Sequence, residues 1–269
     1  MRCRAGRLMR VFACVLATSL ALAPPASASG ATPARVVSLN LCTDELLLQL
    51  ASPGQIASVT HLSQNPRESS LWRKARRYPA NDGSMLSAAG YRPDLVIGMG
   101  STGRDSHRLA RAIGARFVNL PFPTSLDALE AVIAELAQSL GRREQGRRLI
   151  AQLQSARATA PSRLLPAVFV NADNRSHSAT DTGAEWMALA GLRQVKLPGD
   201  RIDREHLLVL PPLVLVKSDY RSDQYSRARA AGPLDRKGDR MIATEGRRWT
   251  CMGPSLLPEI LRIRQGVAR

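Results

Sequence analysis

Residues 35–50 read RVVSLNLCTDELLLQL, and this stretch decides the fold class. The segment from Val36 to Leu39 is short and rich in β-branched residues, which predicts a strand. The segment from Asp44 to Leu50 predicts a helix whose start lies around Asn40 to Thr43. A strand that leads directly into a helix begins a β-α-β unit, so we expect an α/β fold.

The same alternation continues outward along the chain. Short apolar runs predict further strands at 56–59, 94–97, 117–120, 167–170, 194–197, 213–217 and 241–244. Helical patterns lie between several of them, at 106–113, 183–191 and 204–208, and a helix at 254–264 closes the chain. Strands that alternate with helices pair in parallel through right-handed crossovers.

Two helical segments interrupt this alternation in the middle of the chain. Residues 126–140 place leucine, isoleucine and valine at helical spacing, and Gly141 ends the run. Residues 142–159 form a mostly charged helix, a pattern typical of a helix that bridges domains. We therefore predict two α/β lobes with parallel-type sheets flanked by helices, at 29–141 and 162–269, joined by one long linker helix at 142–161.

The first residues have the layout of a secretory signal peptide. Residues 1–10 carry four arginines and no acid, residues 11–23 are apolar or small, and Pro24 and Pro25 break the run. We expect cleavage near Ala28 and a periplasmic product.

The charge of the chain limits its partners. Lys plus Arg number 38 against 22 Asp plus Glu, a formal net charge of +16, and the chain stays strongly basic without the four arginines of the leader. Aromatic residues make up only 4%. A single-stranded nucleic-acid channel usually combines basic residues with stacking aromatics, so no nucleic-acid partner is expected.

A ligand of an open parallel sheet binds outside the carboxyl ends of the strands. Polar and amphipathic side chains at the predicted strand exits therefore form the candidate ligand-binding set. They are Asn40, Cys42, Thr43, His61, Ser101, Thr102, Asn171, Asp173, Tyr220 and Trp249. Trp72 joins them because it lies in polar, irregular sequence where an apolar ligand face can stack, whereas Trp186 is expected in the core.

Two cysteines, Cys42 and Cys251, remain after the leader is removed. In an exported protein they can form a disulfide between the lobes. The alternatives are two independent buried thiols, or a Cys42 thiolate at a helix N-terminus that contacts a metal or soft ligand. Their spacing is not that of a structural zinc site, and the four histidines form no zinc-peptidase motif, so no metal centre is expected.

Several segments together resemble a known family. They are RVVSLNLCTDELLL at 35–48, ASVTHL at 57–62, NDGS at 81–84, RPDLVIG at 92–98 and WTC at 249–251. In this order they are similar to the periplasmic solute-binding proteins of ABC importers for iron-siderophore complexes and cobalamin. The resemblance implies a monomeric, non-enzymatic receptor without a resident cofactor. It implies that an iron chelate, corrinoid or other metal complex binds between two lobes and passes to a permease, the only contact with a membrane.

The resemblance also carries one departure. Members of the family present an acidic residue on each lobe to the permease. Glu205 has this placement on the second lobe, but on the first lobe the position falls near Leu86 or Ser87, and Asp82 is the acid closest to it.

One enzymatic alternative remains. Gly98, Gly100 and Gly103 follow a predicted strand and precede a helix, as in a dinucleotide-binding turn. This would make the chain an exported Rossmann-like oxidoreductase. The predicted strand at 117–120 lacks the acid that would bind the ribose, which disfavours it. Ser101 lacks the first glycine of a nucleophile elbow, which disfavours a hydrolase.

A basic run surrounds Trp72, formed by Arg67, Arg73, Lys74, Arg76 and Arg77. It either attracts anionic ligands or forms a solvated face.

Overall fold

The computed structural model describes residues 32–100, 105–172, 175–202, 204–211, 213–220 and 238–268. The predicted leader at 1–28 lies outside the described residues.

The first sheet is entirely parallel, with strand order β3-β2-β1-β4-β5. Its strands are β1 (Val36–Ser38), β2 (Ile56–Thr60), β3 (Ala80–Asn81), β4 (Leu95–Met99) and β5 (Arg116–Leu120). The helices described around this sheet are α1 (Leu41–Leu50), α2 (Trp72–Ala75), α3 (Met85–Ala89) and α4 (Ser106–Ala112). A single turn of 3-10 helix, η1 (Pro53–Gln55), connects α1 to β2.

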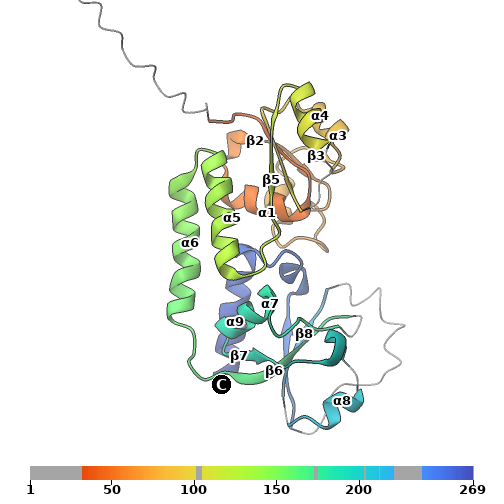
Figure 1. Cartoon of the computed structure of the whole chain (residues 1–269), viewed down its shortest axis with the longest axis vertical. Coiled ribbons are helices and arrows are strands. Elements are labelled where there is room, and N and C mark those ends of the chain that lie inside the picture. The colour runs from red at the N-terminus through yellow and green to blue at the C-terminus, as the bar shows by residue number, and fades with distance from the viewer. Residues whose placement is uncertain are drawn as a thin grey trace, which may run out of the picture. The chain divides into compact units, whose positions relative to one another are not determined.

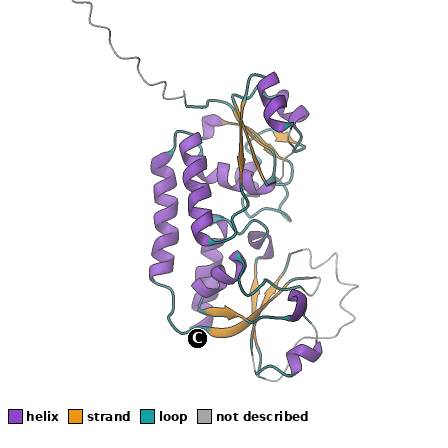
Figure 2. Cartoon of the chain, in the orientation of Figure 1, coloured by secondary structure: helices purple, strands orange, loops and turns teal. Residues whose placement is uncertain are grey.

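The second sheet is also parallel, with order β7-β6-β8-β9. Its strands are β6 (Leu165–Val170), β7 (Leu192–Gln194), β8 (Val214–Ser218) and β9 (Arg240–Thr244). The described residues of this part of the chain include the helices α7 (Thr182–Leu189), α8 (Arg204–Leu208) and α9 (Leu257–Val267). Short 3-10 turns lie at η2 (Pro198–Asp200), η4 (Gly246–Trp249) and η5 (Pro254–Leu256). Figure 2 shows the two groups of strands with helices around them. The predicted α/β class with two parallel sheets is confirmed.

Helix α1 begins within residues 40–43, as predicted. Asn40 is its N-cap, and the side chain of Asn40 accepts a hydrogen bond of 2.9 Å from the backbone N–H of Thr43. In the first turn, Asp44 is fully buried and accepts hydrogen bonds from the backbone N–H and the hydroxyl of Thr60 on β2. Burial raises the pKa of Asp44 to about 7, and the hydrogen bonds only partly oppose this rise. The cap and this buried carboxyl fix α1 against the sheet.

Helices α5 (Leu126–Ser139) and α6 (Arg143–Ala158) form a hairpin between the two sheets in sequence (Figure 1). Gly141, with φ of 68°, ends α5, a conformation that favours glycine. The two helices approach closely at Gly146, where an added Cβ would lie 2.5 Å from the Cβ of Ala137. The expected linker helix is thus one arm of a packed pair. The lobe boundaries at 141 and 162 remain predictions.

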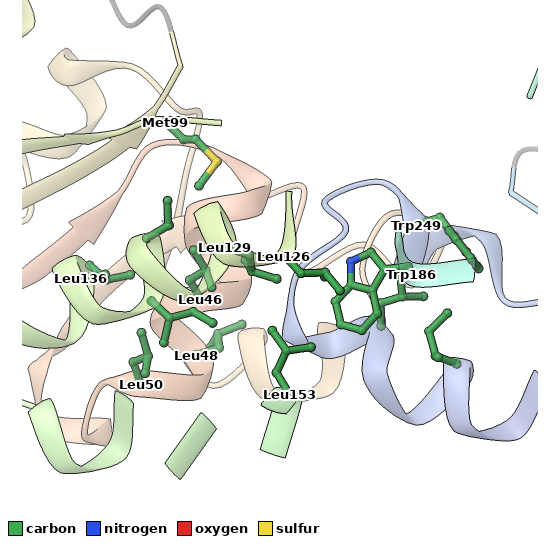
Figure 3. Close-up of a cluster of buried hydrophobic side chains, with 14 of the residues drawn as sticks. Leu46, Leu48, Leu50, Met99, Leu126, Leu129, Leu136, Leu153, Trp186 and Trp249 are labelled. Atoms are coloured by element: carbon green, nitrogen blue, oxygen red, sulfur yellow. The ribbon is translucent and has the colours of Figure 1, made fainter. Parts of the chain in front are cut away.

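One apolar cluster continues from the first sheet to the second. It contains leucines of α1 and α5, Leu153 of α6, and Trp186 of α7. Figure 3 shows Leu126 and Leu153 between the α1 leucines and Trp186. Trp186 is fully buried, which confirms its predicted place in the core. Both sheets therefore share one core through the helical hairpin.

Candidate functional site

A pocket of about 430 Å³ lies where three loops meet. The loops follow β5, precede α7 and follow η4. Their lining residues are Phe122, Pro123, Thr124, Thr180, Asp181, Thr182, Thr250, Cys251 and Met252. The first loop leaves the carboxyl end of a strand in the first sheet, and the other two lie beyond carboxyl ends of strands in the second. Both sheets thus contribute to the region where an α/β fold binds its ligands.

Asp181 occupies the N-cap of α7 at one wall of the pocket. Its carboxylate accepts hydrogen bonds of 2.9 Å from the backbone N–H groups of Ala184 and Ser178. The Nδ1 atom of His177 lies 3.4 Å from the same carboxylate. Partial burial acts to raise the pKa of Asp181, but the contacts with His177, Ala184 and Ser178 outweigh it and hold the pKa below its usual value. Asp181 is therefore a carboxylate at neutral pH.

The loop after β5 is tied to α7. The hydroxyl of Thr182 donates a hydrogen bond of 3.0 Å to the carbonyl of Pro123. The Glu185 carboxylate accepts one of 2.6 Å from the backbone N–H of Leu126, in the first turn of α5. Phe122 stays 57% exposed beside these contacts. The pocket therefore combines a fixed frame with one accessible aromatic ring.

Cys251 lines the pocket as half of a disulfide. The Sγ atoms of Cys42 and Cys251 are 2.14 Å apart and the Cα atoms 5.2 Å apart. The sequence allows three states for Cys42 and Cys251: a disulfide, two independent thiols, or a metal-binding thiolate at Cys42. The structure contains the disulfide. Cys42 consequently has no thiolate with which to contact a metal or soft ligand. That expectation is corrected.

A buried carboxyl lies next to the disulfide in the fold. Glu45 accepts hydrogen bonds from the hydroxyls of Ser69, at 2.9 Å, and Ser255, at 2.7 Å. Burial raises the pKa of Glu45, although these two hydrogen bonds and the charges of Arg248 and Arg247 oppose the rise. Since Ser255 follows the second sheet and Glu45 belongs to α1, this carboxyl joins the same two regions as the disulfide.

The structure corrects the prediction that Trp249 lines an open cleft. Its side chain is only 4% exposed, and its indole N–H donates a hydrogen bond of 2.9 Å to the Thr244 hydroxyl. The ring packs against Phe169 and His177, with centroid distances of 4.7 and 5.5 Å. Thr43 is likewise fully buried and bonded to Ser38 at 2.7 Å. Neither side chain presents a surface to a ligand here.

Tyr220 connects the second sheet to the loop after β2. Its hydroxyl donates a hydrogen bond of 2.6 Å to the Glu68 carboxylate. Arg247 donates to the carbonyl of Pro66 in the same loop. Tyr220 is half-buried in this contact.

The other predicted ligand residues lie at separate places. Asn40 caps α1, and its amide lies 3.4 Å from the carbonyl of Met99. His61 is exposed, with Nδ1 3.3 Å from the carbonyl of Asn81. Asn171 accepts a hydrogen bond of 2.7 Å from the Arg175 N–H. Ser101, Thr102 and Asp173 lie outside the described residues.

Trp72 at the start of α2 clusters with two arginines of the basic run. The guanidinium carbons of Arg73 and Arg76 lie 4.4 and 4.6 Å from the centroid of the Trp72 ring, at cation–π distance. Lys74 donates to the carbonyl of Leu48. None of these residues lines the pocket described above.

Of the predicted site residues that the structure describes, only Cys251 lines this pocket. Phe122 and Thr124 belong to a predicted strand exit, so the sequence indicated their region without singling them out. Asp181 was missed, and its only local signal is that of a helix N-cap. Among the described residues, no three His, Cys, Asp or Glu side chains gather as a metal site would require. In that same part of the chain, every helix is too short or too polar to span a bilayer.

No protein-family model and no curated protein sequence matches the chain. Solved structures do. The periplasmic heme-binding protein HutB of Vibrio cholerae aligns with a TM-score of 0.67 at 17% identity, over 87% of this chain and 99% of HutB. The periplasmic vitamin B12-binding protein BtuF of Vibrio cholerae aligns with a TM-score of 0.63 at 18% identity, over 88% of this chain and 97% of BtuF. The siderophore-binding protein BauB, bound to ferric iron and two acinetobactin molecules, aligns with a TM-score of 0.66 at 17% identity, over 87% of this chain and 93% of BauB. The chain therefore shares the fold of periplasmic proteins that bind such solutes.

Proposed function

We propose that this chain is an exported, non-enzymatic solute-binding protein. It captures a metal chelate, a corrinoid or a similar ligand at the pocket between the two sheets and delivers it to an ABC permease. The metal complex is cargo, and no resident cofactor takes part. The observation that carries the proposal is the pocket itself, because loops from both sheets of this fold build it at the carboxyl ends of their strands.

The lining suits a ligand with a broad apolar face. Phe122, Pro123, Met252 and the disulfide supply apolar surface, and threonine hydroxyls supply hydrogen-bonding groups. Pockets for large organic ligands have this composition, with few polar groups that fix orientation. The neighbours of the same fold bind heme, vitamin B12 and a ferric siderophore, which are ligands of this kind.

The contacts of the glycine turn favour the receptor over the oxidoreductase. Gly100 has φ of 78°, and an added Cβ would lie 3.2 Å from the ring of Phe122. The amide of Asn119 on β5 donates a hydrogen bond of 2.8 Å to the carbonyl of Gly100. Gly100 therefore supports the pocket loop, a role that needs no nucleotide. Gly103 lies outside the described residues.

Delivery requires a docking surface for the permease. Glu205 on α8 is exposed and is proposed as the acidic docking residue of the second sheet's region. On α3, Leu86 is 87% exposed where an acid would be expected, and Asp82 is the exposed acid before that helix. We propose that a monomer docks through Glu205, with Asp82 as the candidate acid in the region of the first sheet.

Titration of the intrinsic tryptophan fluorescence tests the proposed function. The probes are cyanocobalamin, hemin, ferrioxamine B and NAD. We expect saturable binding of at least one metal complex. Phe122→Ala should weaken that binding by about tenfold, because the ligand loses its stacking contact with the aromatic ring. Leu109→Ala is the matched control, since Leu109 is an exposed apolar residue on α4 that does not line the pocket. A response to NAD alone would favour the oxidoreductase.

A further inference from the structure

The charge of the pocket differs from that of the chain. The whole sequence carries 38 Lys and Arg against 22 Asp and Glu. The described lining of the pocket contains neither Lys nor Arg, and Asp181 is its single charged side chain. A strongly basic protein thus places a carboxylate, and no described cation, at the wall where its ligand is proposed to bind.

The N-terminus of α7 already holds a carboxylate of the chain itself, that of Asp181. A helix N-terminus attracts anions through its unpaired backbone N–H groups and the helix dipole. Here the carboxylate of Asp181 accepts from the N–H of Ala184 within the helix and from the N–H of Ser178 before it. An entering anion would have to displace this carboxylate or lie beside it. The protein has therefore supplied its own negative charge at this position.

The carboxylate is accessible from the pocket. The Asp181 side chain is 37% exposed and lines the cavity, while His177 approaches it from the buried side. Thr180 and Thr250, which carry hydroxyls, line the same pocket. Hydroxyls donate and accept, so they serve amides and other neutral polar groups equally well. A carboxylate only accepts, so it favours ammonium or amide N–H groups and repels other carboxylates.

We infer that this pocket selects ligands whose entering face is uncharged or cationic, and that Asp181 is the residue that determines this specificity. The inference rests on the proposed function. The preferred class is a neutral or singly cationic metal complex with amide or ammonium N–H groups at its edge. Complexes that present carboxylates at that edge are disfavoured, because two carboxylates in a partly desolvated pocket repel each other.

Ferrioxamine B and its N-acetyl derivative form a matched pair of probes, since acetylation removes the pendant ammonium and changes little else. Hemin, with two propionates, is the anionic probe, and cyanocobalamin is the uncharged one with many amides. We expect the native chain to bind the cationic or uncharged probes at least tenfold more tightly than hemin. Raising the salt concentration should narrow this difference.

Asp181→Asn removes the charge and keeps a side-chain oxygen that can cap α7. It should weaken binding of the ammonium-bearing probe by about tenfold, strengthen hemin binding, and leave the acetylated probe nearly unchanged. Asp105→Asn is the control, because Asp105 is an exposed acid at the N-cap of α4 and does not line the pocket. If the Asn variant has a lowered melting temperature, Asp181→Ser gives the same comparison with a different capping oxygen.

The outcomes separate the two proposals. Tighter binding of hemin by the native chain, or equal affinities of the native chain and Asp181→Asn for every probe, would overturn the inference and leave the solute-binding function standing. Absence of binding by all four probes would overturn the proposed function and the inference with it.

Discussion

Two joints hold the regions of the two sheets together, and they use different physical means. The helical hairpin of α5 and α6 is an apolar joint with exposed ion pairs on its outside. The joint at α1 is a disulfide beside a buried carboxyl that accepts hydrogen bonds from Ser69 and Ser255. The first joint is local in sequence, whereas the second connects residues 209 positions apart.

This difference teaches where the stability of the pocket originates. The hairpin forms from neighbouring segments and loses little chain entropy when it closes. The α1 joint closes most of the chain into one loop, so a covalent bond there removes a large entropy from the unfolded state. Because Cys251 also lines the pocket, the α1 joint fixes the ligand site directly. Breaking the α1 joint should therefore lower the free energy of unfolding more than weakening the contacts of the hairpin does.

The largest effect is expected from Cys42→Ser combined with Cys251→Ser. A chain-entropy calculation for a loop of this length gives about 5 kcal/mol of lost unfolding free energy. Urea denaturation of the double variant and of the native chain measures it. The native chain with reductant is the control and should lose a similar amount. A loss below about 1 kcal/mol would show that the disulfide does not carry this joint.

The next effect concerns the carboxyl of the same joint. Glu45→Ala leaves the buried hydroxyls of Ser69 and Ser255 without their acceptor and creates a cavity, so we expect a loss of about 2–4 kcal/mol. Glu45→Gln retains an acceptor oxygen of similar size and should lose less. Chemical denaturation at pH 7 checks both. Equal losses in the two variants would mean that the side-chain oxygens contribute little.

The pH dependence of this joint follows from the raised pKa of Glu45. Because burial raises that pKa above the unfolded value, the contribution of Glu45 is complete below the unfolded pKa and is lost as the pH rises through the folded pKa. The contribution of Asp44 to stability is likewise lost as the pH rises from 3.8 to about 7, because burial raises its pKa between these values. The native chain should therefore gain stability relative to Glu45→Gln when the pH falls from 8 to 5. A difference that does not change with pH would contradict the assignment.

A smaller effect is expected at the hairpin. Alanine usually stabilises a helix relative to glycine, by up to about 1 kcal/mol. At Gly146 the new Cβ would meet that of Ala137 at 2.5 Å, so Gly146→Ala should instead destabilise the chain by about 1–2 kcal/mol. Gly266→Ala on α9 is the control, because an added Cβ there meets no atom within 4 Å and should be neutral or stabilising. Thermal unfolding distinguishes the two, and a gain at Gly146 would disprove the close packing.

The smallest effect is expected at the ion pairs on the outer surface of the hairpin. Arg157 on α6 pairs with Asp127, at 2.5 Å, and with Glu130, at 3.1 Å, on α5. Water screens such surface pairs, so Arg157→Ala should cost less than about 1 kcal/mol, and the cost should shrink in high salt. Urea denaturation at two salt concentrations measures this. A salt-independent loss above 2 kcal/mol would mean that these ion pairs contribute as much to the free energy of unfolding as the contacts of the α1 joint do.

Local patterns predicted most of the fold. The short β-branched runs between helices gave strands close to their observed positions, because alternation of apolar strands and helices is a local property. The strand expected at 194–197 is instead β7, at Leu192–Gln194, and the two-residue β3 was too short to leave an apolar pattern. Such errors fall where the local signal is weak.

The candidate site was harder to predict because it depends on contacts between distant segments. Trp249 lies in the polar sequence GRRWTC, which suggested exposure, but its ring packs against Phe169 of strand β6. Asp181 carries only the signal of a helix N-cap. Its position at a pocket wall depends on a loop that begins 59 residues earlier, where Pro123 accepts a hydrogen bond from Thr182.

By itself, the sequence determined the α/β class, the parallel pairing and the basic charge, because these follow from the order and composition of neighbouring residues. It also offered the pairing of Cys42 with Cys251 as one of three possibilities. The tertiary structure alone shows that the pairing forms, that Trp249 is buried, and that Asp181 lines the pocket. Each of these depends on which distant side chains meet in space, and neither spacing nor hydrophobic pattern records that.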